Sequence, residues 1–186
     1  YNLRAAMYHK KAENHVKKAI EAAPGNVENY SLLCEATNGV VWDWNIVNHH
    51  SLIEYYYELI RKHPTTTIIY IWLIENLIAD MRLDEAEKML SNLESIDKSI
   101  HIYRFKGNIA LKRGDIDNAE AIYSEMINVF SDSWQALSYF ADFYANLGQY
   151  NKALELYKKA ASLQASPRLI DNYLCIAHIS EIEQNN

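Results

Sequence analysis

Glycine, proline and cysteine are all scarce in this chain: its 186 residues include only 5 Gly, 3 Pro and 2 Cys. A sandwich or barrel of many short strands needs frequent turn residues, so this composition argues against one and favours long helices joined by short loops. The chain is nevertheless 49% apolar and 23% charged, which is enough apolar surface to build a core and argues against a disordered segment.

Long apolar runs are missing too. The longest extends from Ile68 to Ile74, whereas a membrane span needs about 20 apolar residues, and the first residues lack the apolar region of a signal peptide. Cys34 and Cys175 lie far apart within apolar helical patterns, which predicts two small core side chains rather than a disulfide, and a reducing, cytoplasmic compartment. Because the chain begins with Tyr rather than Met, we expect it to be an excised or processed part of a longer protein.

Positive charge is also in short supply. The chain has 18 Lys and Arg against 24 Asp and Glu, a formal net charge of −6. This balance argues against nucleic acid or an anionic membrane as the main partner. The charge is uneven, because the first 24 residues carry Arg4, Lys10, Lys11, Lys17 and Lys18 against only Glu13 and Glu21.

The sequence motifs of common catalytic and cofactor sites are absent. No GxGxxG, GxxxxGK[ST], HExxH or GxSxG occurs in the sequence. His49 and His50 lie near Asp43, but adjacent histidines on a helix point in different directions and no third ligand has suitable spacing. The sequence therefore predicts neither an enzyme nor a metal or cofactor site.

What the chain does contain is an internal repeat. Residues 106–127 align with residues 140–161 at an offset of 34, which places Gly114 on Gly148, Ala119 on Ala153 and Tyr123 on Tyr157. A third copy covers residues 73–93, where Ala86 precedes Ala119 by 33 residues. A fixed period of this length is typical of an array of stacked supersecondary units.

Each copy is predicted to form two helices. Apolar residues recur at helical spacing on both sides of Gly114-Asp115, and Gly is the residue that most readily takes the left-handed conformation at a helix C-terminus. Ser133 is a natural N-cap for the next helix. By the same reasoning we expect helices at about 66–80, 83–95, 99–113, 116–130, 134–147, 150–164 and 167–183.

The 34-residue helix-turn-helix unit resembles the tetratricopeptide repeat. That family has a small residue midway along its first helix, where Gly107 and Ala141 stand, and Ala in its second helix, where Ala119 and Ala153 stand. Small residues let two helix backbones approach closely. The resemblance implies an all-α, right-handed superhelical solenoid of antiparallel helix pairs with about eleven helices.

The resemblance also suggests how one solenoid, residues 1–186, is divided. The expected parts are a truncated repeat (1–25), a divergent repeat (26–65) with an insertion at 38–50, three regular repeats (67–99, 100–133 and 134–167) and a capping helix (168–186). Ala119 and Ala153 should lie buried at helix crossings.

In tetratricopeptide proteins the first helices of successive repeats line a concave groove that binds peptides or helices. The resemblance therefore implies a groove that is apolar at one end and polar at the other. Its predicted lining is Ile68, Ile71, Glu75 and Ile78 in the third unit, His101, Arg104, Asn108 and Lys112 in the fourth, and Gln135, Ser138, Asp142 and Asn146 in the fifth.

One branch of that family grips the C-terminal carboxylate of chaperone tails with Lys, Arg and Asn side chains on three first helices. Arg104 and Asn108 match the first pair of this clamp. Tyr139 stands where the clamp needs Asn, and Leu169 and Tyr173 stand where it needs Lys and Arg, so the sequence argues against this ligand.

Trp42 and Trp44 lie in the insertion and leave two interpretations open. They either fold back over the solenoid or offer an exposed apolar contact, which makes them the alternative interface. The function predicted first is a scaffold that binds a protein, a peptide or a partner domain of the same full-length chain. The alternative is a regulatory or oligomerising module whose effector domain is absent here.

Overall fold

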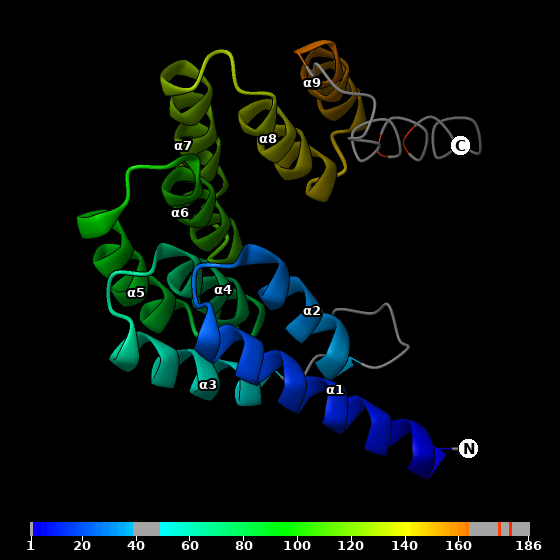
Figure 1. Ribbon diagram of the computed structural model, residues 1–186. Helices are drawn as coiled ribbons and strands as arrows, with labels where there is room; N and C mark the ends of the chain where they lie inside the picture. Colours follow the sequence, from blue (N-terminus) through cyan, green and yellow to red (C-terminus); the bar gives the residue numbers. More distant parts are fainter. Residues whose placement is uncertain (1, 39–48, 164–174, 176–178, 180–186) are drawn as a thin grey trace. The chain divides into compact units, whose positions relative to one another are not determined.

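The computed structural model describes residues 2–38 and 49–163 together with Cys175 and Ile179, and within these residues the chain is helical with no strand. The helices of this part, labelled in Figure 1, are α1 (Asn2–Ala22), α2 (Val27–Asn38), α3 (His49–Lys62), α4 (Thr67–Ala79), α5 (Leu83–Ile96), α6 (Ile100–Lys112), α7 (Ile116–Val129), α8 (Trp134–Asn146) and α9 (Tyr150–Leu163). From α4 onward, each begins and ends within one residue of its predicted bounds.

The described helices number nine rather than about eleven, for two reasons. Residues 2–22 form one continuous helix, whereas the truncated repeat expected at 1–25 would have contained two. No Gly or Pro interrupts this stretch, so no residue ends the helix before Ala22. Apart from Cys175 and Ile179, the other expected helix, at 167–183, lies outside the described residues, as do Trp42 and Trp44.

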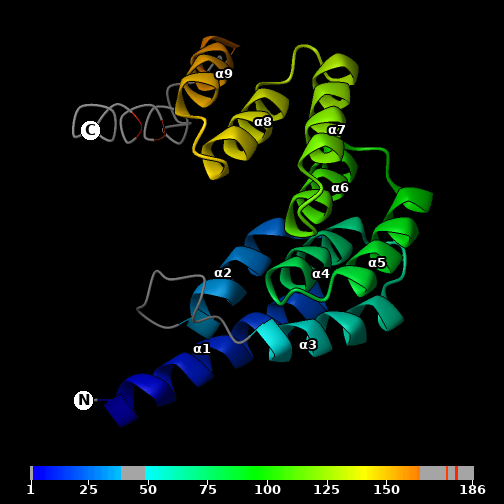
Figure 2. The same ribbon diagram turned by 180° about the vertical axis from the view of Figure 1, so that it is seen from behind.

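The chain divides into two compact units, residues 1–98 and 99–186. In the first unit α1 packs on α2, and α4 packs on both α3 and α5. In the second, α7 packs on α6 and α8, and α8 packs on α9. The helices of each unit stack as antiparallel neighbours in both views (Figures 1 and 2). The single solenoid expected for residues 1–186 stays a prediction.

Aromatic rings join the helices of the first unit. The ring of Tyr30 on α2 lies 6.1 Å from that of Tyr56 on α3 and stacks at 6.5 Å on that of Trp72 on α4. Tyr30 and Tyr56 are fully buried, so both are core residues. The chain neighbours of Tyr56 are half-buried: the Tyr55 hydroxyl donates to the Lys17 carbonyl on α1, and the Tyr57 hydroxyl donates to Glu85 on α5.

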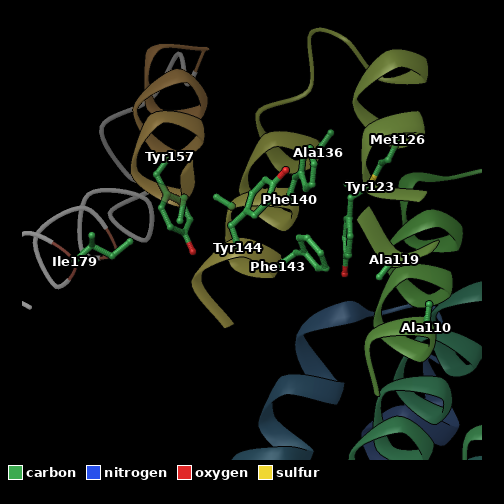
Figure 3. Close-up of a cluster of buried hydrophobic side chains, with 12 residues drawn as sticks. Ala110, Ala119, Tyr123, Met126, Ala136, Phe140, Phe143, Tyr144, Tyr157 and Ile179 are labelled. Carbon is green, nitrogen blue, oxygen red and sulfur yellow. The ribbon is translucent and has the colours of Figure 1, made fainter. Parts of the chain in front are cut away.

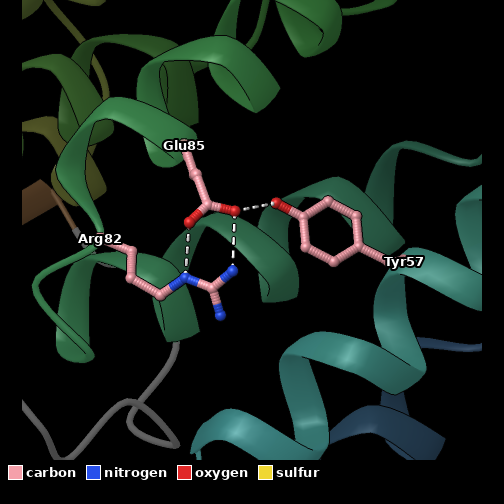
Figure 4. Close-up of polar contacts among 3 residues, drawn as sticks. All are labelled: Tyr57, Arg82 and Glu85. Atoms are coloured by element: carbon pink, nitrogen blue, oxygen red, sulfur yellow. Dashed lines mark hydrogen bonds and ion pairs between the residues drawn. The ribbon is translucent and has the colours of Figure 1, made fainter.

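Tyr57 belongs to a small polar cluster that ties α3 to the start of α5 (Figure 4). Arg82 donates from Nε and Nη2 to the two carboxylate oxygens of Glu85 at 2.7 Å, and the Tyr57 hydroxyl lies 3.0 Å from Oε2. The hydrogen bonds from Arg82 are the main cause of a lowered pKa of Glu85, and the hydrogen bond from Tyr57 adds to it. The ion pair is partly exposed, so it contributes only about 0–1 kcal/mol to stability.

The second unit has its core between α6, α7, α8 and α9 (Figure 3). Tyr123 on α7 stacks on Phe140 of α8 with ring centroids 5.9 Å apart, and Phe143 lies 5.2 Å away. Ala119 and Ala153 are fully buried, as predicted.

Replacing Ala153 with Leu should lower the free energy of unfolding by about 1–3 kcal/mol, because three extra carbons have no space at a fully buried position. Urea denaturation followed by circular dichroism measures this loss. Lys152→Leu is the matched control, since the neighbouring side chain is exposed. An unchanged Ala153→Leu midpoint would mean that the position is not closely packed.

The turns inside the three regular repeats share a left-handed residue. Gly114 and Gly148 have φ of 81° and 71°, which confirms the prediction that a left-handed Gly closes the first helix. The N–H one residue later bonds back to the helix in both turns, from Asp115 to Ala110 and from Gln149 to Tyr144. In the α4–α5 turn the left-handed residue is Met81, with φ of 59° and 57% of its surface exposed.

Met81→Gly should therefore raise the free energy of unfolding by about 0.5–1 kcal/mol. The left-handed conformation costs an L-residue about 1–2 kcal/mol, and the extra freedom of Gly in the unfolded chain offsets part of the gain. The exposed Met side chain contributes little packing. Urea midpoints give the change, with Gly148→Ala as the converse variant that should lose about 1 kcal/mol. A less stable Met81→Gly protein would show that the side chain makes contacts that outweigh the strain.

Candidate peptide-binding face

The residues predicted to line a groove lie on three first helices. Ile68, Ile71 and Glu75 are half-buried on α4, whereas Ile78 is buried in the core of the first unit. The others are on α6 and α8 of the second unit, where Lys112, Asp142 and Asn146 are exposed, Ser138 is buried, and His101, Arg104, Asn108 and Gln135 are half-buried. Because α4 belongs to the other unit, its part in one continuous groove stays a prediction.

Arg104 on α6 lies against two aromatic rings, one on its own helix and one on α8. Its guanidinium carbon lies 4.5 Å from the ring centroid of Phe105 and 5.1 Å from that of Tyr139 on α8. A cation over an aromatic ring contributes about 0.5–2 kcal/mol, depending on how far it is desolvated. The two rings fix the planar group, and a planar guanidinium can donate two parallel hydrogen bonds to a carboxylate or to peptide carbonyls.

Asn108 is held from the neighbouring helix. The Tyr123 hydroxyl of α7 lies 2.7 Å from Asn108 Oδ1 and 3.5 Å from the Arg104 carbonyl. Tyr123 is 2% exposed, and burial raises its pKa, so the hydroxyl keeps its proton and acts as the donor. The amide oxygen of Asn108 is thus used inside the protein, and the Nδ2 group is what the side chain can offer to a partner.

Asp142 is held in the same way one repeat later. Its Oδ1 accepts a hydrogen bond from the hydroxyl of Tyr157 on α9. Although Asp142 is exposed as a residue, desolvation of its carboxyl group raises its pKa, while the Tyr157 hydroxyl and the positive charge of Arg104 act in the opposite direction. Burial is the main cause of the raised pKa of Tyr157.

Arg104 of α6 thus acts electrostatically on Asp142 of α8, while Asn108 follows Arg104 by one turn and Ser138 precedes Asp142 by one turn on the same helices. Apolar spacing in the sequence did not identify Tyr123 and Tyr157 as part of this arrangement. The signal was present, since each tyrosine follows its polar partner by 15 residues in both repeats.

Other kinds of site are not found in the described residues. No group of three or more His, Cys, Asp or Glu side chains there could hold a metal ion. None of the helices in residues 2–38 and 49–163 has the length and apolarity needed to cross a membrane.

Known proteins with a similar sequence or fold are tetratricopeptide repeat proteins. Residues 135–167 match the tetratricopeptide repeat family, and a search of curated protein sequences gives no match. A thermophilic tetratricopeptide repeat protein of Thermus thermophilus has a similar structure, with a TM-score of 0.64 and 20% identity over 96% of this chain and 94% of its own. A tetratricopeptide repeat protein of Parabacteroides merdae has a TM-score of 0.68 and 16% identity over 97% of this chain and 68% of its own.

Yeast Tom70 is similar as well, with a TM-score of 0.61 and 20% identity over 81% of this chain and 30% of Tom70. At such identities these likenesses show the fold alone. The chain therefore contains a tetratricopeptide repeat at 135–167 and has the all-α fold of tetratricopeptide repeat proteins, as its sequence predicted. That fold is in general a scaffold for protein interactions rather than for catalysis.

Proposed function

We propose that this chain binds an extended peptide segment of another protein on the face formed by α6 and α8, the first helices of its second unit, with Arg104 and Asn108 as polar anchors. His101, Lys112, Gln135, Ser138 and Asp142 complete this face. The part expected on α4, with Ile68 and Ile71 as an apolar wall and with Glu75, stays a prediction from the sequence. The partner is a protein or peptide, including a partner domain of the same full-length chain, in the reducing cytoplasmic compartment that the cysteines indicate.

The observation that carries the proposal is the placement of Arg104. A guanidinium fixed on the rings of Phe105 and Tyr139 has already lost much of its side-chain freedom, so it binds a partner at a lower entropic cost than a flexible Lys or Arg would. Four residues further along α6, on the same helix face, Asn108 has its amide oxygen occupied by Tyr123. A charged donor and a neutral donor thus lie one helical turn apart, which suits the carbonyl and carboxylate oxygens of an extended peptide.

Arg104→Gln should weaken binding of a peptide selected on the wild-type chain by about 10-fold or more, the usual cost of losing a charge-assisted hydrogen bond. A randomised peptide display library supplies the peptide, and fluorescence anisotropy measures the dissociation constant. The matched control is Lys152→Gln on α9, because Lys152 also lies over an aromatic ring, that of Tyr144 at 4.7 Å. It should change the affinity less than 2-fold, which is about 0.4 kcal/mol.

Circular dichroism would verify that both variants stay helical. A peptide whose affinity ignores Arg104, Asn108 and Ile71 but falls when Trp42 or Trp44 is changed would place the interface on the insertion and contradict the proposal.

A further inference from the structure

The two tyrosines on the second helices suggest how the face obtains its hydrogen-bonding character. Tyr123 and Tyr157 occupy equivalent positions 34 residues apart, and each donates its hydroxyl to the polar residue 15 positions earlier, on the first helix of its own repeat. The regular repeat at 67–99 lacks this link, because buried Leu90 stands at the equivalent position on α5. The hydroxyl is therefore an addition of the second unit and not a requirement of helix pairing.

Neither tyrosine can easily turn its hydroxyl elsewhere. Tyr123 is fixed by ring contacts with Phe140 and Phe143, and its ring edge lies directly over Gly107, where even a Cβ atom would come within 2.6 Å. Tyr157 is 3% exposed. Figure 3 shows each ring extending away from its own helix with the hydroxyl at the far end. The rings are part of the core, and only the hydroxyls reach the predicted face.

We propose that Tyr123 and Tyr157 are positioning residues that set what each repeat offers to a partner: a donor at Asn108 and an acceptor at Asp142. When the hydroxyl of Tyr123 occupies Oδ1 of Asn108, the remaining group of that side chain is the Nδ2 donor. When the hydroxyl of Tyr157 occupies Oδ1 of Asp142, the remaining group is an oxygen. This inference rests on the proposed function, and it deepens it by assigning opposite hydrogen-bonding roles to two repeats.

The partner that fits is an extended peptide whose carbonyl oxygen meets Asn108 and whose N–H or cationic side chain meets Asp142. A peptide backbone carries both kinds of group, and a Lys or Arg side chain adds charge complementarity at Asp142. Arg104 from α6 and Tyr157 from α9 act on the Asp142 carboxylate, Cys175 acts on Tyr157, and Asp142 in turn acts on Tyr123.

The first test uses the protein without any partner. Tyr157→Phe keeps the ring but removes the hydrogen bond to the carboxylate, so the pKa of Asp142 should rise by about 0.5–1 unit in an NMR titration of its carboxyl carbon. Tyr123→Phe should release the Asn108 amide, seen as a shift and faster hydrogen exchange of its Nδ2 protons. Unchanged signals for both residues would overturn the positioning role.

The matched control is Tyr144→Phe. The Tyr144 hydroxyl donates to Glu120 at 2.7 Å, so this variant also removes one tyrosine hydrogen bond, but from an acceptor that is not part of the proposed face. Tyr123→Phe, Tyr157→Phe and Tyr144→Phe should lower the free energy of unfolding by similar amounts. Only Tyr123→Phe and Tyr157→Phe should move the NMR signals of the face or lower the affinity for a selected peptide, by about 3–10-fold. Equal weakening by Tyr144→Phe would reduce the effect to general destabilisation and overturn the inference.

Two exchanges test the assigned roles directly. Asn108→Asp and Asp142→Asn each copy the combination found in the other repeat, so the tyrosine can still donate to the new side chain and the fold is expected to persist. Each exchange reverses the group offered to the partner and should weaken the selected peptide about 10-fold or more. In an Asn108→Ala background, Tyr123→Phe should have no further effect on affinity if Tyr123 acts through Asn108.

The outcomes separate the two proposals. If the free-protein signals of Asn108 and Asp142 stay unchanged, the positioning role is wrong while the peptide-binding face stands. If those signals move as expected but no selected peptide depends on Arg104, Asn108 or Asp142, the proposed function is wrong, and the role of the tyrosines in binding falls with it.

Discussion

Asn76→Asp is expected to lower the free energy of unfolding by about 4 kcal/mol at pH 7, a substantial part of the stability of a domain of this size. Asn76 is 1% exposed on α4, and its Nδ2 donates to the Trp72 carbonyl at 2.7 Å. A carboxylate there is buried and faces a carbonyl oxygen. The group therefore protonates instead, and holding a carboxyl protonated about 3 pH units above its usual pKa of about 3.9 costs about 4 kcal/mol.

The expected pH dependence has a definite sign. Because burial raises the pKa of the new carboxyl in the folded state, the folded protein binds the proton more tightly than the unfolded chain does. The stability of the variant should then fall as pH rises from about 4 toward its raised pKa, by about 1.4 kcal/mol for each unit. Near pH 4 the protonated carboxyl can donate to the Trp72 carbonyl as the amide does. Urea denaturation at pH 4, 5.5 and 7, with wild type beside it, measures the slope.

Asn76→Leu is the matched control for this prediction. The equivalent positions in the next two repeats are Ile109 and Phe143, both buried and apolar, so an apolar side chain suits this place in the fold. The Trp72 carbonyl also lies within the backbone hydrogen bonding of α4, so loss of the amide leaves no orphaned carbonyl. Asn76→Leu should change stability by no more than about 1.5 kcal/mol, with no slope between pH 4 and 7. A similar loss in both variants would show that the amide itself, and not burial of charge, decides stability here.

The helices could be predicted because their signals are local. Apolar residues at helical spacing, Gly114 and Gly148 at helix ends and the cap at Ser133 place the helix bounds within one residue from α4 onward. The burial of Ala119 and Ala153 followed from the repeat alignment. These features depend on nearby residues or on the repeat period, and both are visible in one sequence.

The details that escaped prediction depend on contacts between helices. The strained conformation of Met81 shows only when its position is aligned with Gly114, 33 residues later, because Met alone gives no sign of a left-handed turn. The link from Tyr123 to Asn108 depends on how α6 and α7 face each other, so apolar spacing identified Tyr123 only as a core residue. The groove residues stay predictions, since helical spacing identifies a shared face but no ligand.

Gly107→Val should lower the free energy of unfolding by about 3–5 kcal/mol, the second large effect that we expect. A Cβ at Gly107 would lie 2.6 and 2.7 Å from Cε2 and Cζ of Tyr123, well inside the normal contact distance. The ring cannot move away, because it stacks on Phe140 and its hydroxyl is bonded to Asn108. A branched side chain therefore displaces the ring from the core, and the loss should approach that of truncating a buried aromatic residue.

Two milder variants test this reasoning. Gly107→Ala introduces the same Cβ contact but gains about 1 kcal/mol of helix propensity, so its loss should be smaller, about 1–2 kcal/mol. The converse variant is Ala141→Gly at the equivalent position on α8, which creates no clash and should cost about 1 kcal/mol through backbone freedom alone. Thermal and urea unfolding rank the three variants. If Gly107→Ala instead stabilises the protein, the Tyr123 ring has room to shift, and the near-UV circular dichroism of the tyrosines should change with it, since ring packing and the hydrogen bond to Asn108 cannot both survive that movement.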